Sequence, residues 1–182
     1  MADLLFADCL AFTLAQEGGY VDDPDDPGGA TNMGITLATL QQWDHDAALD
    51  PANVEAMTRQ TAAAIYRAMY WNTLSGDSLP PGVDLSAFDF GVNAGPGRSA
   101  VLLQEALGFT GDEVDGCVGP VTLRAALMAK PAQVIVDLAT RQAAYYRGLA
   151  EFDIFGQGWL DRTERRRQAA LALLRQDAAT TA

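Results

Sequence analysis

The sequence has little histidine, little cysteine and little positive charge. It contains one histidine, His45, and two cysteines, Cys9 and Cys117. A single histidine gives no support for a histidine-ligated zinc site or a Ser–His–Asp triad, and no Cys–His pairing indicates a cysteine peptidase. The two cysteines lie too far apart for a metal-site spacing. Isolated thiols in an intracellular chain are usually small core residues, which is what we expect of both.

Basic residues are outnumbered, with 12 Lys and Arg against 24 Asp and Glu, a net charge of −12. This balance disfavours nucleic acid and an anionic membrane surface as partners. No apolar run approaches the roughly 18 residues of a membrane span, so we expect no membrane insertion. The first residues, 1–4, carry an acid where a secretory signal would carry Lys or Arg. We therefore expect synthesis in the cytoplasm without a signal peptide, and access to any external target through lysis, a holin-like pore or an export machine.

What the sequence does contain is a helical pattern. At 182 residues and 49% hydrophobic content, it can form one domain with a real core, or one domain with a small appended subdomain. Apolar periodicity, capping residues and N1 prolines predict helices over 3–17, 36–43, 58–72, 84–93, 98–107, 121–129, 131–152 and 159–176, with a short turn from 50. Segment 30–36 predicts a small β-hairpin. The expected fold is mainly α, divided near the Gly- and Pro-rich segment 75–83 into regions 1–83 and 84–182.

The stretch from Glu17 to Trp43 carries the most reactive chemistry. Glu17 ends the first predicted helix, and Gly18 and Gly19 stop that helix and leave open backbone beside it. The negative end of the helix dipole, and burial beside aromatic side chains, would favour a protonated carboxyl, the form that a general acid needs. The alternative is an ordinary surface glutamate at a helix end.

Four aspartates, at positions 22, 23, 25 and 26, follow in a turn-rich loop. Paired carboxylates suit glycoside hydrolysis, in which one protonates the leaving oxygen and the other activates water or stabilises positive charge. Calcium is a competing use, but the prolines break the ligand pattern of an EF-hand loop and no closing glutamate follows. A solvated turn is the plain interpretation for three of the four.

The residues of this stretch resemble the glycoside hydrolase family 108 N-acetylmuramidases. The motif Glu17-Gly18-Gly19-Tyr20 is followed in order by the segment 26–36, which reads DPGGATNMGIT. This resemblance covers roughly residues 4–90. The segments 88–95 (FDFGVNAG) and 115–123 (DGCVGPVTL) are similar to the predicted peptidoglycan-binding region that accompanies the family.

The resemblance implies a lysozyme-like helical fold and hydrolysis of the β-1,4 bond between N-acetylmuramic acid and N-acetylglucosamine, without a metal or cofactor. It implies that Glu17 is the general acid. Phage-type lysozymes add an Asp nine residues after the Glu and a Thr about six further on. Asp26 matches the first spacing, whereas Thr31 is one residue short of the second. Asp26 is thus the candidate base or electrostatic partner, and Thr31 the candidate for holding water.

Other side chains are candidates for binding the glycan. Tyr20, Tyr66 and Trp71 could stack on sugar rings, although core packing is the alternative for each. Asn32 and Asn93 could hydrogen-bond N-acetyl groups, or serve in turns and caps. Asp89 and Gln104 are expected to join interhelical contacts only. The arginines in 162–167 are expected to pack and to form a solvated face, where a basic patch could touch acidic stem peptides.

We therefore expect a peptidoglycan hydrolase, an endolysin-like lysozyme of phage, gene transfer agent or secretion system type, with glycan strands as its partner. Two alternatives remain open at this point. A lytic transglycosylase also needs one acidic glutamate, and it would yield anhydro-muramic products. A non-catalytic phage-tail or wall-docking module would bind the glycan without cleaving it.

Overall fold

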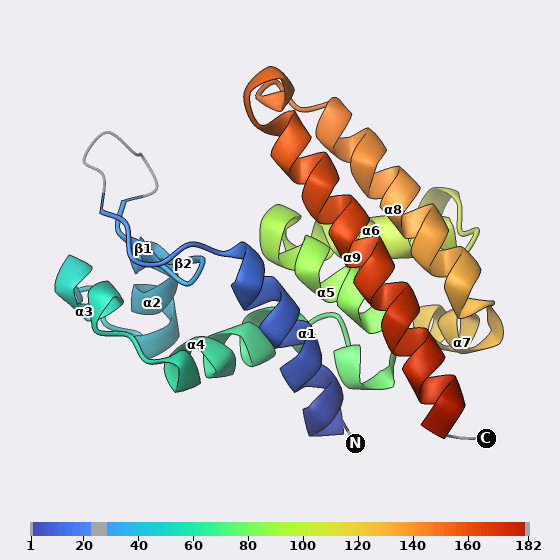
Figure 1. The fold of residues 1–182 in the computed structure, drawn as a ribbon, viewed down its shortest axis with the longest axis horizontal. Helices are drawn as coiled ribbons and strands as arrows, with labels where there is room; N and C mark the ends of the chain where they lie inside the picture. The colour runs from blue at the N-terminus through green and yellow to red at the C-terminus, as the bar shows by residue number, and fades with distance from the viewer. Residues whose placement is uncertain (1, 23–28, 181–182) are drawn as a thin grey trace.

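The protein, described by a computed structural model for residues 2–22 and 29–180, is mainly helical with one small hairpin (Figure 1), as the sequence predicts. The strands are β1 (Thr31–Asn32) and β2 (Ile35–Thr36), paired antiparallel. The α-helices are α1 (Ala2–Gln16), α2 (Leu37–Asp44), α3 (Pro51–Glu55), α4 (Arg59–Tyr66), α5 (Val83–Ala94), α6 (Pro96–Ala106), α7 (Pro120–Met128), α8 (Pro131–Arg147) and α9 (Phe152–Thr180). The shorter turns are a π-helix, Arg67–Trp71, and two 3-10 turns, Gly76–Ser78 and Gly111–Glu113.

Side-chain caps set the starts of the N-terminal helices. Thr36 and Thr58 cap α2 and α4, each accepting a hydrogen bond from the backbone N–H three residues on. Asp50 forms a capping box with Asn53 at the start of α3. These three caps follow directly from the sequence. The helix predicted over 84–93 instead begins at Val83, so Asp84 lies within the first turn of α5, where its Oδ1 accepts from Gly82 N and Leu85 N.

The largest difference from the expected elements is at α9. The sequence predicts one helix to residue 152 and another from 159, with Gly156 and Gly158 between them. Instead α8 ends at Arg147 and α9 begins at Phe152, so both glycines lie inside α9. Gly156 is needed there because a Cβ at this position would lie 2.5 Å from the Phe152 ring. Gly156 therefore permits close packing at the tip where α8 turns into α9, whereas a Cβ at Gly158 would meet nothing within 4 Å.

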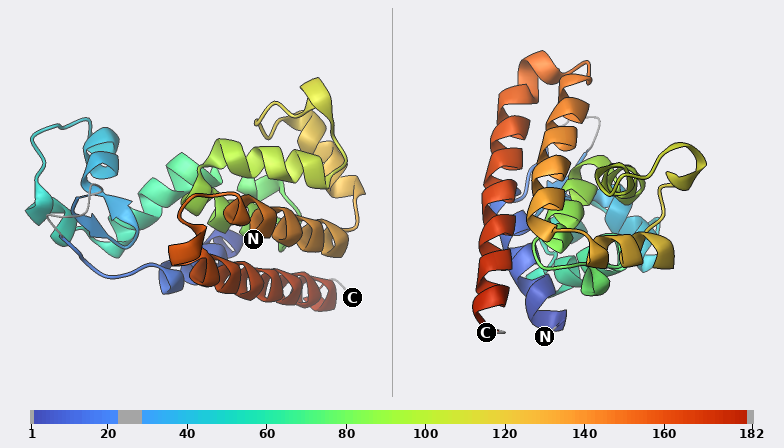
Figure 2. Two further views of the ribbon diagram at one scale, coloured as in Figure 1. Left: turned by 90° about the horizontal axis from the view of Figure 1, so that it is seen from above. Right: turned by 90° about the vertical axis from the view of Figure 1, so that its right-hand side faces the viewer.

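Helix α5 lies at the centre of the molecule. It packs against α1, α6, α8 and α9, and most of its side chains are buried. Edge-to-face contacts join Phe88 to Phe6, Tyr66 and Trp71. At one end of the molecule, β1, β2, α2 and α3 form a separate lobe, called here the N-terminal lobe, while the α8–α9 pair runs along the other side (Figures 1 and 2).

The two cysteines differ in their surroundings. Cys9 is buried in the core, as expected, but Cys117 is exposed, because the loop that carries it turns outward; neither forms a disulfide. None of the helices within the described parts of the chain has the length and apolar character to cross a membrane.

Candidate active site

Glu17 is the first residue beyond α1, and its backbone N–H still donates to Thr13 O at 3.2 Å. Its side chain is 19% exposed, so the carboxyl is sheltered but reachable. Gly18 and Gly19 are exposed, and a Cβ at either would meet no atom within 4 Å. The chain beyond Glu17 is therefore open, as the two glycines predict.

An arginine from the far end of the chain holds the Glu17 carboxyl. Arg162 Nη1, on α9, donates to Glu17 Oε1 at 2.8 Å. The same guanidinium also donates two hydrogen bonds to Asp89 of α5, from Nη2 to Oδ1 at 2.7 Å and from Nε to Oδ2 at 3.1 Å. The planar fork of arginine suits such two-point binding, which fixes its orientation. Glu17 is thus positioned by a side chain that is itself anchored in the core.

Asp89 is the buried centre of this network, with its side chain fully buried. Besides Arg162, it accepts from Arg166 Nη1 at 2.6 Å and from Thr13 Oγ1 at 2.9 Å. Burial alone would raise the pKa of Asp89, but the two arginines outweigh it and hold this pKa below its usual value. Asp89 is therefore a stable carboxylate whose charge is shared by Arg162 and Arg166.

The tip of the hairpin lies on another side of the Glu17 carboxyl. Met33 and Gly34 connect β1 to β2 with φ values of 50° and 75°, the two positive angles of a type I′ turn. Tyr66 Oη donates to Met33 O at 2.8 Å and so ties α4 to this turn. A Cβ on Gly34 would lie 2.6 Å from Tyr66 Oη and 2.8 Å from Glu17 Oε2. The missing side chain leaves room for the carboxyl.

Replacing Gly34 with alanine should lower the free energy of unfolding by about 1–3 kcal/mol, through the positive φ and the overlap with Tyr66 and Glu17. Urea unfolding measures this change. Gly97→Ala is the matched control, because a Cβ there meets nothing within 4 Å and φ is not positive. Equal stability of the two variants would contradict the tight packing at Gly34.

The predicted residues of the acidic loop are only partly visible. Asp26, with Asp23 and Asp25, lies outside the described residues. Asp22 is described, and its Oδ2 accepts a 3.4 Å hydrogen bond from the Tyr20 hydroxyl at the surface. Thr31 lies in β1, half-buried, with its hydroxyl donating to Gly29 O at 3.3 Å.

The predicted sugar-binding residues are dispersed. Tyr66 lies beside Glu17, but its ring is buried and only its hydroxyl reaches the site. Trp71 is fully buried in the core, where its Nε1 donates a hydrogen bond to Asp77 Oδ1 at 2.8 Å. Neither face of its ring is therefore available to a sugar. Asn32 is buried and ties the hairpin to α3 by donating to Val54 O and Glu55 O. Tyr20 is half-buried, and Asn93 is exposed in the last turn of α5.

Sequence reasoning missed the two arginines of this network, of which Arg162 binds Glu17 and Arg166 binds Asp89. Arg162 and Arg166 are buried ion-pair partners, not members of a solvated face, because α9 packs them against α5. Their spacing of four residues, which places both on one face of a helix, was the available signal. Tyr70 was also missed. It lies in the π-helix beside Tyr66, with ring centroids 5.6 Å apart, and burial and the Glu17 charge raise the pKa of Tyr70. It stays a neutral phenol near the carboxyl.

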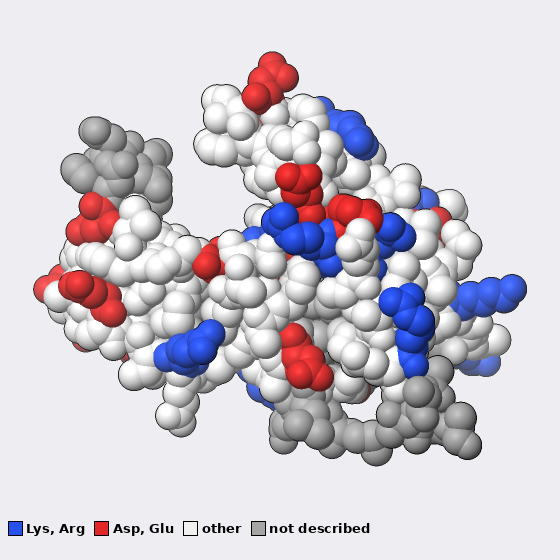
Figure 3. Space-filling view, in the orientation of Figure 1, with Lys and Arg blue, Asp and Glu red and all other residues white. Residues whose placement is uncertain are grey.

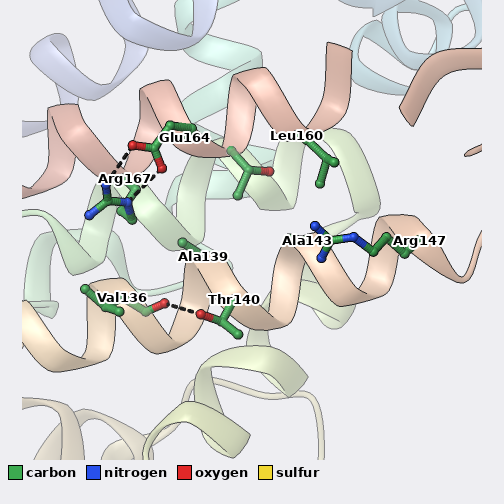
Figure 4. Close-up of a pocket in the computed structure, with 9 residues that line it drawn as sticks. Val136, Ala139, Thr140, Ala143, Arg147, Leu160, Glu164 and Arg167 are labelled. Atoms are coloured by element: carbon green, nitrogen blue, oxygen red, sulfur yellow. Dashed lines mark hydrogen bonds and ion pairs between the residues drawn. The ribbon is translucent and has the colours of Figure 1, made fainter. Parts of the chain in front are cut away.

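The pocket of about 350 Å³ in Figure 4 lies between α8 and α9, away from Glu17. Its lining includes the small side chains of Ala139 and Ala143 on α8 and the Glu164–Arg167 ion pair on α9. Its lining includes none of Glu17, Asp89, Arg162 and Arg166. Across residues 2–22 and 29–180, no three His, Cys, Asp or Glu side chains gather as metal ligands. The Glu17 network combines a partly exposed carboxyl with buried charged partners, which makes it the candidate catalytic site.

Comparison with known proteins finds matches over most of the chain. A family model described as Glycosyl hydrolase 108 matches residues 10–95, and one described as Predicted Peptidoglycan domain matches residues 98–164. Among solved structures, SagA of Brucella abortus is 44% identical, with 93% of this chain and 95% of that chain covered and a TM-score of 0.84. No curated protein matches. The first match includes Glu17 and Asp89, and the second includes Arg162.

Proposed function

Because the chain belongs to the glycosyl hydrolase 108 family, we propose that Glu17 is the general acid with which this N-acetylmuramidase cleaves peptidoglycan. The single observation that carries the proposal is the arrangement of its carboxyl. Glu17 is sheltered, bound by Arg162 at 2.8 Å and flanked by a glycine turn that leaves it accessible. An ordinary glutamate at the end of a surface helix would have no such support from α9.

The reaction breaks the bond between C1 of N-acetylmuramic acid and the bridging oxygen O4 of N-acetylglucosamine. Glu17 gives its proton to that oxygen, which leaves as a hydroxyl. Water supplies the oxygen that bonds to C1, and the proton of this water restores the acid–base pair. The products are a reducing N-acetylmuramic acid end and a free 4-hydroxyl, so atoms and charge balance.

Arg162 acts as a positioning residue in this proposal. Once Glu17 has released its proton, the guanidinium 2.8 Å away stabilises the carboxylate that remains. Asp89 keeps Arg162 in place by two hydrogen bonds. The negative charges of Asp89 and Glu17 together offset the positive charges of Arg162 and Arg166. The carboxyl therefore keeps one orientation through the proton transfer, as preorganised catalysis requires.

The second group remains a proposal from the resemblance. Asp26 is the candidate for activating water or stabilising the positive charge that develops at C1, and Thr31 the candidate for holding the water. Tyr20, Asn32, Tyr66 and Asn93 are the remaining candidates for contacts with the glycan. Trp71 is not carried forward because of its burial.

The two expected regions, 1–83 and 84–182, are not independent in this proposal. Region 84–182 supplies Asp89 and Arg162, which support the Glu17 of region 1–83. The first family match also runs to residue 95, through the whole of α5. We propose that the second region completes the active site and also binds the wall.

Its family places the action of the protein at the cell wall, on peptidoglycan. Access through a holin, a phage-like particle or a secretion machine is part of the proposal.

The proposal is tested by mass spectrometry of the muropeptides released from purified sacculi. A hydrolase adds one water per cleavage, so the expected products have reducing muramic ends. Anhydro-muramic products would instead identify a lytic transglycosylase. Binding to sacculi with no loss of turbidity would identify a wall-docking module.

A further inference from the structure

The tip where α8 turns into α9 exposes two large apolar side chains. Ile154 is 76% exposed and Phe155 is 55% exposed, both in the first turn of α9. A contiguous apolar patch on a soluble protein commonly marks a binding surface. The tip projects beyond the body of the protein on the side that faces the N-terminal lobe (Figure 1), and the surface between the two is hollowed (Figure 3).

The register of α9 places this patch in line with the active site. Phe155, Trp159 and Arg162 follow each other at steps of four and three residues, so they share one face of the helix. Arg162, on that face, holds the Glu17 carboxyl. At about 1.5 Å per residue, Phe155 lies about 10 Å along α9 from Arg162. A polymer bound at Glu17 and running along α9 would therefore meet Trp159 and then Phe155.

The two aromatic rings form the outer end of a packed series. Phe155 and Trp159 have ring centroids 5.8 Å apart, and Trp159 stacks on Tyr146 of α8 at 5.2 Å. Tyr146 in turn meets Phe90 of the central helix α5 at 5.6 Å. The position of Trp159 is thus fixed by its stacking on Tyr146, and the exposed ring of Phe155 packs against this fixed side chain. A rigid aromatic surface loses little conformational entropy on binding.

We propose that Phe155 and Trp159 form a stacking platform for a sugar ring of the glycan strand, on the same face of α9 as Arg162, which binds the Glu17 carboxyl. The proposal rests on the proposed function and adds a binding site to it. Aromatic faces suit the apolar face of a pyranose. A protein with a net charge of −12 cannot attract an acidic wall polymer by its overall charge, so neutral stacking is a suitable means of holding it.

The charge at the tip favours a glycan strand over a membrane surface as the partner of this aromatic platform. Glu151 and Asp153 flank the apolar residues and are exposed, and acidic side chains gather at the summit of the tip in Figure 3. Anionic lipid headgroups would repel these carboxylates. A glycan strand reaching the ring from the Glu17 side would not meet them.

The test uses Glu17→Gln as the background, so that the strand stays uncut, and peptide-free glycan strands from sacculi as the probe. Adding Phe155→Ala should weaken their binding on the order of tenfold by calorimetry, the size expected for loss of one aromatic contact. Glycan should also change the fluorescence of Trp159, a change that Trp159→Phe removes. Met128→Ala is the matched control, since Met128 is 78% exposed on α7, and it should bind as the background does.

Equal binding with and without Phe155, in proteins with the same thermal midpoint, would overturn the proposal. The proposal would also be overturned if Phe155→Ala lost binding to phosphatidylglycerol vesicles, or changed the oligomeric state, while it still bound glycan as the background does. These outcomes differ from those that would refute the role of Glu17 as general acid. That role would be refuted by lysis of sacculi by Glu17→Gln, a result that says nothing about the contribution of Phe155 to glycan binding.

Discussion

Replacing Asp89 with asparagine should lower the free energy of unfolding by about 3–5 kcal/mol, the cost of removing one partner from a buried ion pair. The Asp89 side chain is fully buried and accepts hydrogen bonds from Arg162, Arg166 and Thr13. Asparagine keeps the shape but not the charge, so two buried guanidiniums would face a neutral amide. Among the described residues, Glu17 would then be the one carboxylate still bound to Arg162.

Urea unfolding followed by circular dichroism measures this loss. Asp112→Asn serves as the control, because Asp112 is an exposed aspartate in a 3-10 turn and its substitution should change stability by less than about 0.5 kcal/mol. A loss in Asp89→Asn as small as in the control would mean that the ion pairs around Asp89 do not stabilise the fold.

The same carboxylate gives stability a pH dependence of known sign. The arginines hold the pKa of Asp89 below the value of about 3.9 that it takes in the unfolded chain. Its contribution is therefore complete above that value and is lost as the pH falls through the lower, folded pKa. Part of the acid-induced loss of stability in the wild type should be missing from Asp89→Asn.

Replacing Glu17 with glutamine should reduce the rate of sacculus lysis by about 10²–10⁴-fold, the contribution of a general acid. Glutamine is nearly isosteric and can still accept a hydrogen bond from Arg162, so the fold and glycan binding should be kept. Turbidity loss measures the rate, and a pull-down with sacculi measures binding.

Glu105→Gln is the matched control for this variant. Glu105 also pairs with an arginine, Arg141 at 2.9 Å, but on the surface and away from the Glu17 network. Its lysis rate should equal that of the wild type. A Glu17→Gln protein that is folded, binds sacculi and lyses them as fast as Glu105→Gln would remove Glu17 from the chemistry.

Local structure was predictable where one side chain decides it. The caps at Thr36 and Thr58 and the hairpin at 30–36 follow from short-range chemistry, which a single sequence contains. The end of the helix at Glu17 follows from its two glycines for the same reason. By contrast, Gly156 and Gly158 lie within α9 despite their low helix propensity, and at Gly156 close packing against the Phe152 ring requires the glycine.

The support of the site was not predictable, because it depends on distant pairing. Arg162 lies 145 positions from Glu17 and 73 from Asp89. Periodicity places Arg162 and Arg166 on one face of a helix, but it does not say which surface that face meets. Trp71 shows the same limit: its ring is suited to a sugar or to a core, and only the packing of α1 and α5 around it decides for the core.

The most direct test of the central claim is a count of new reducing muramic ends released from purified sacculi by the wild type and by Glu17→Gln at equal concentration. The account predicts a steady release by the wild type and, from the variant, release at least about 10²-fold slower although it binds the same sacculi. Release of the same ends by the variant at the wild-type rate would contradict it.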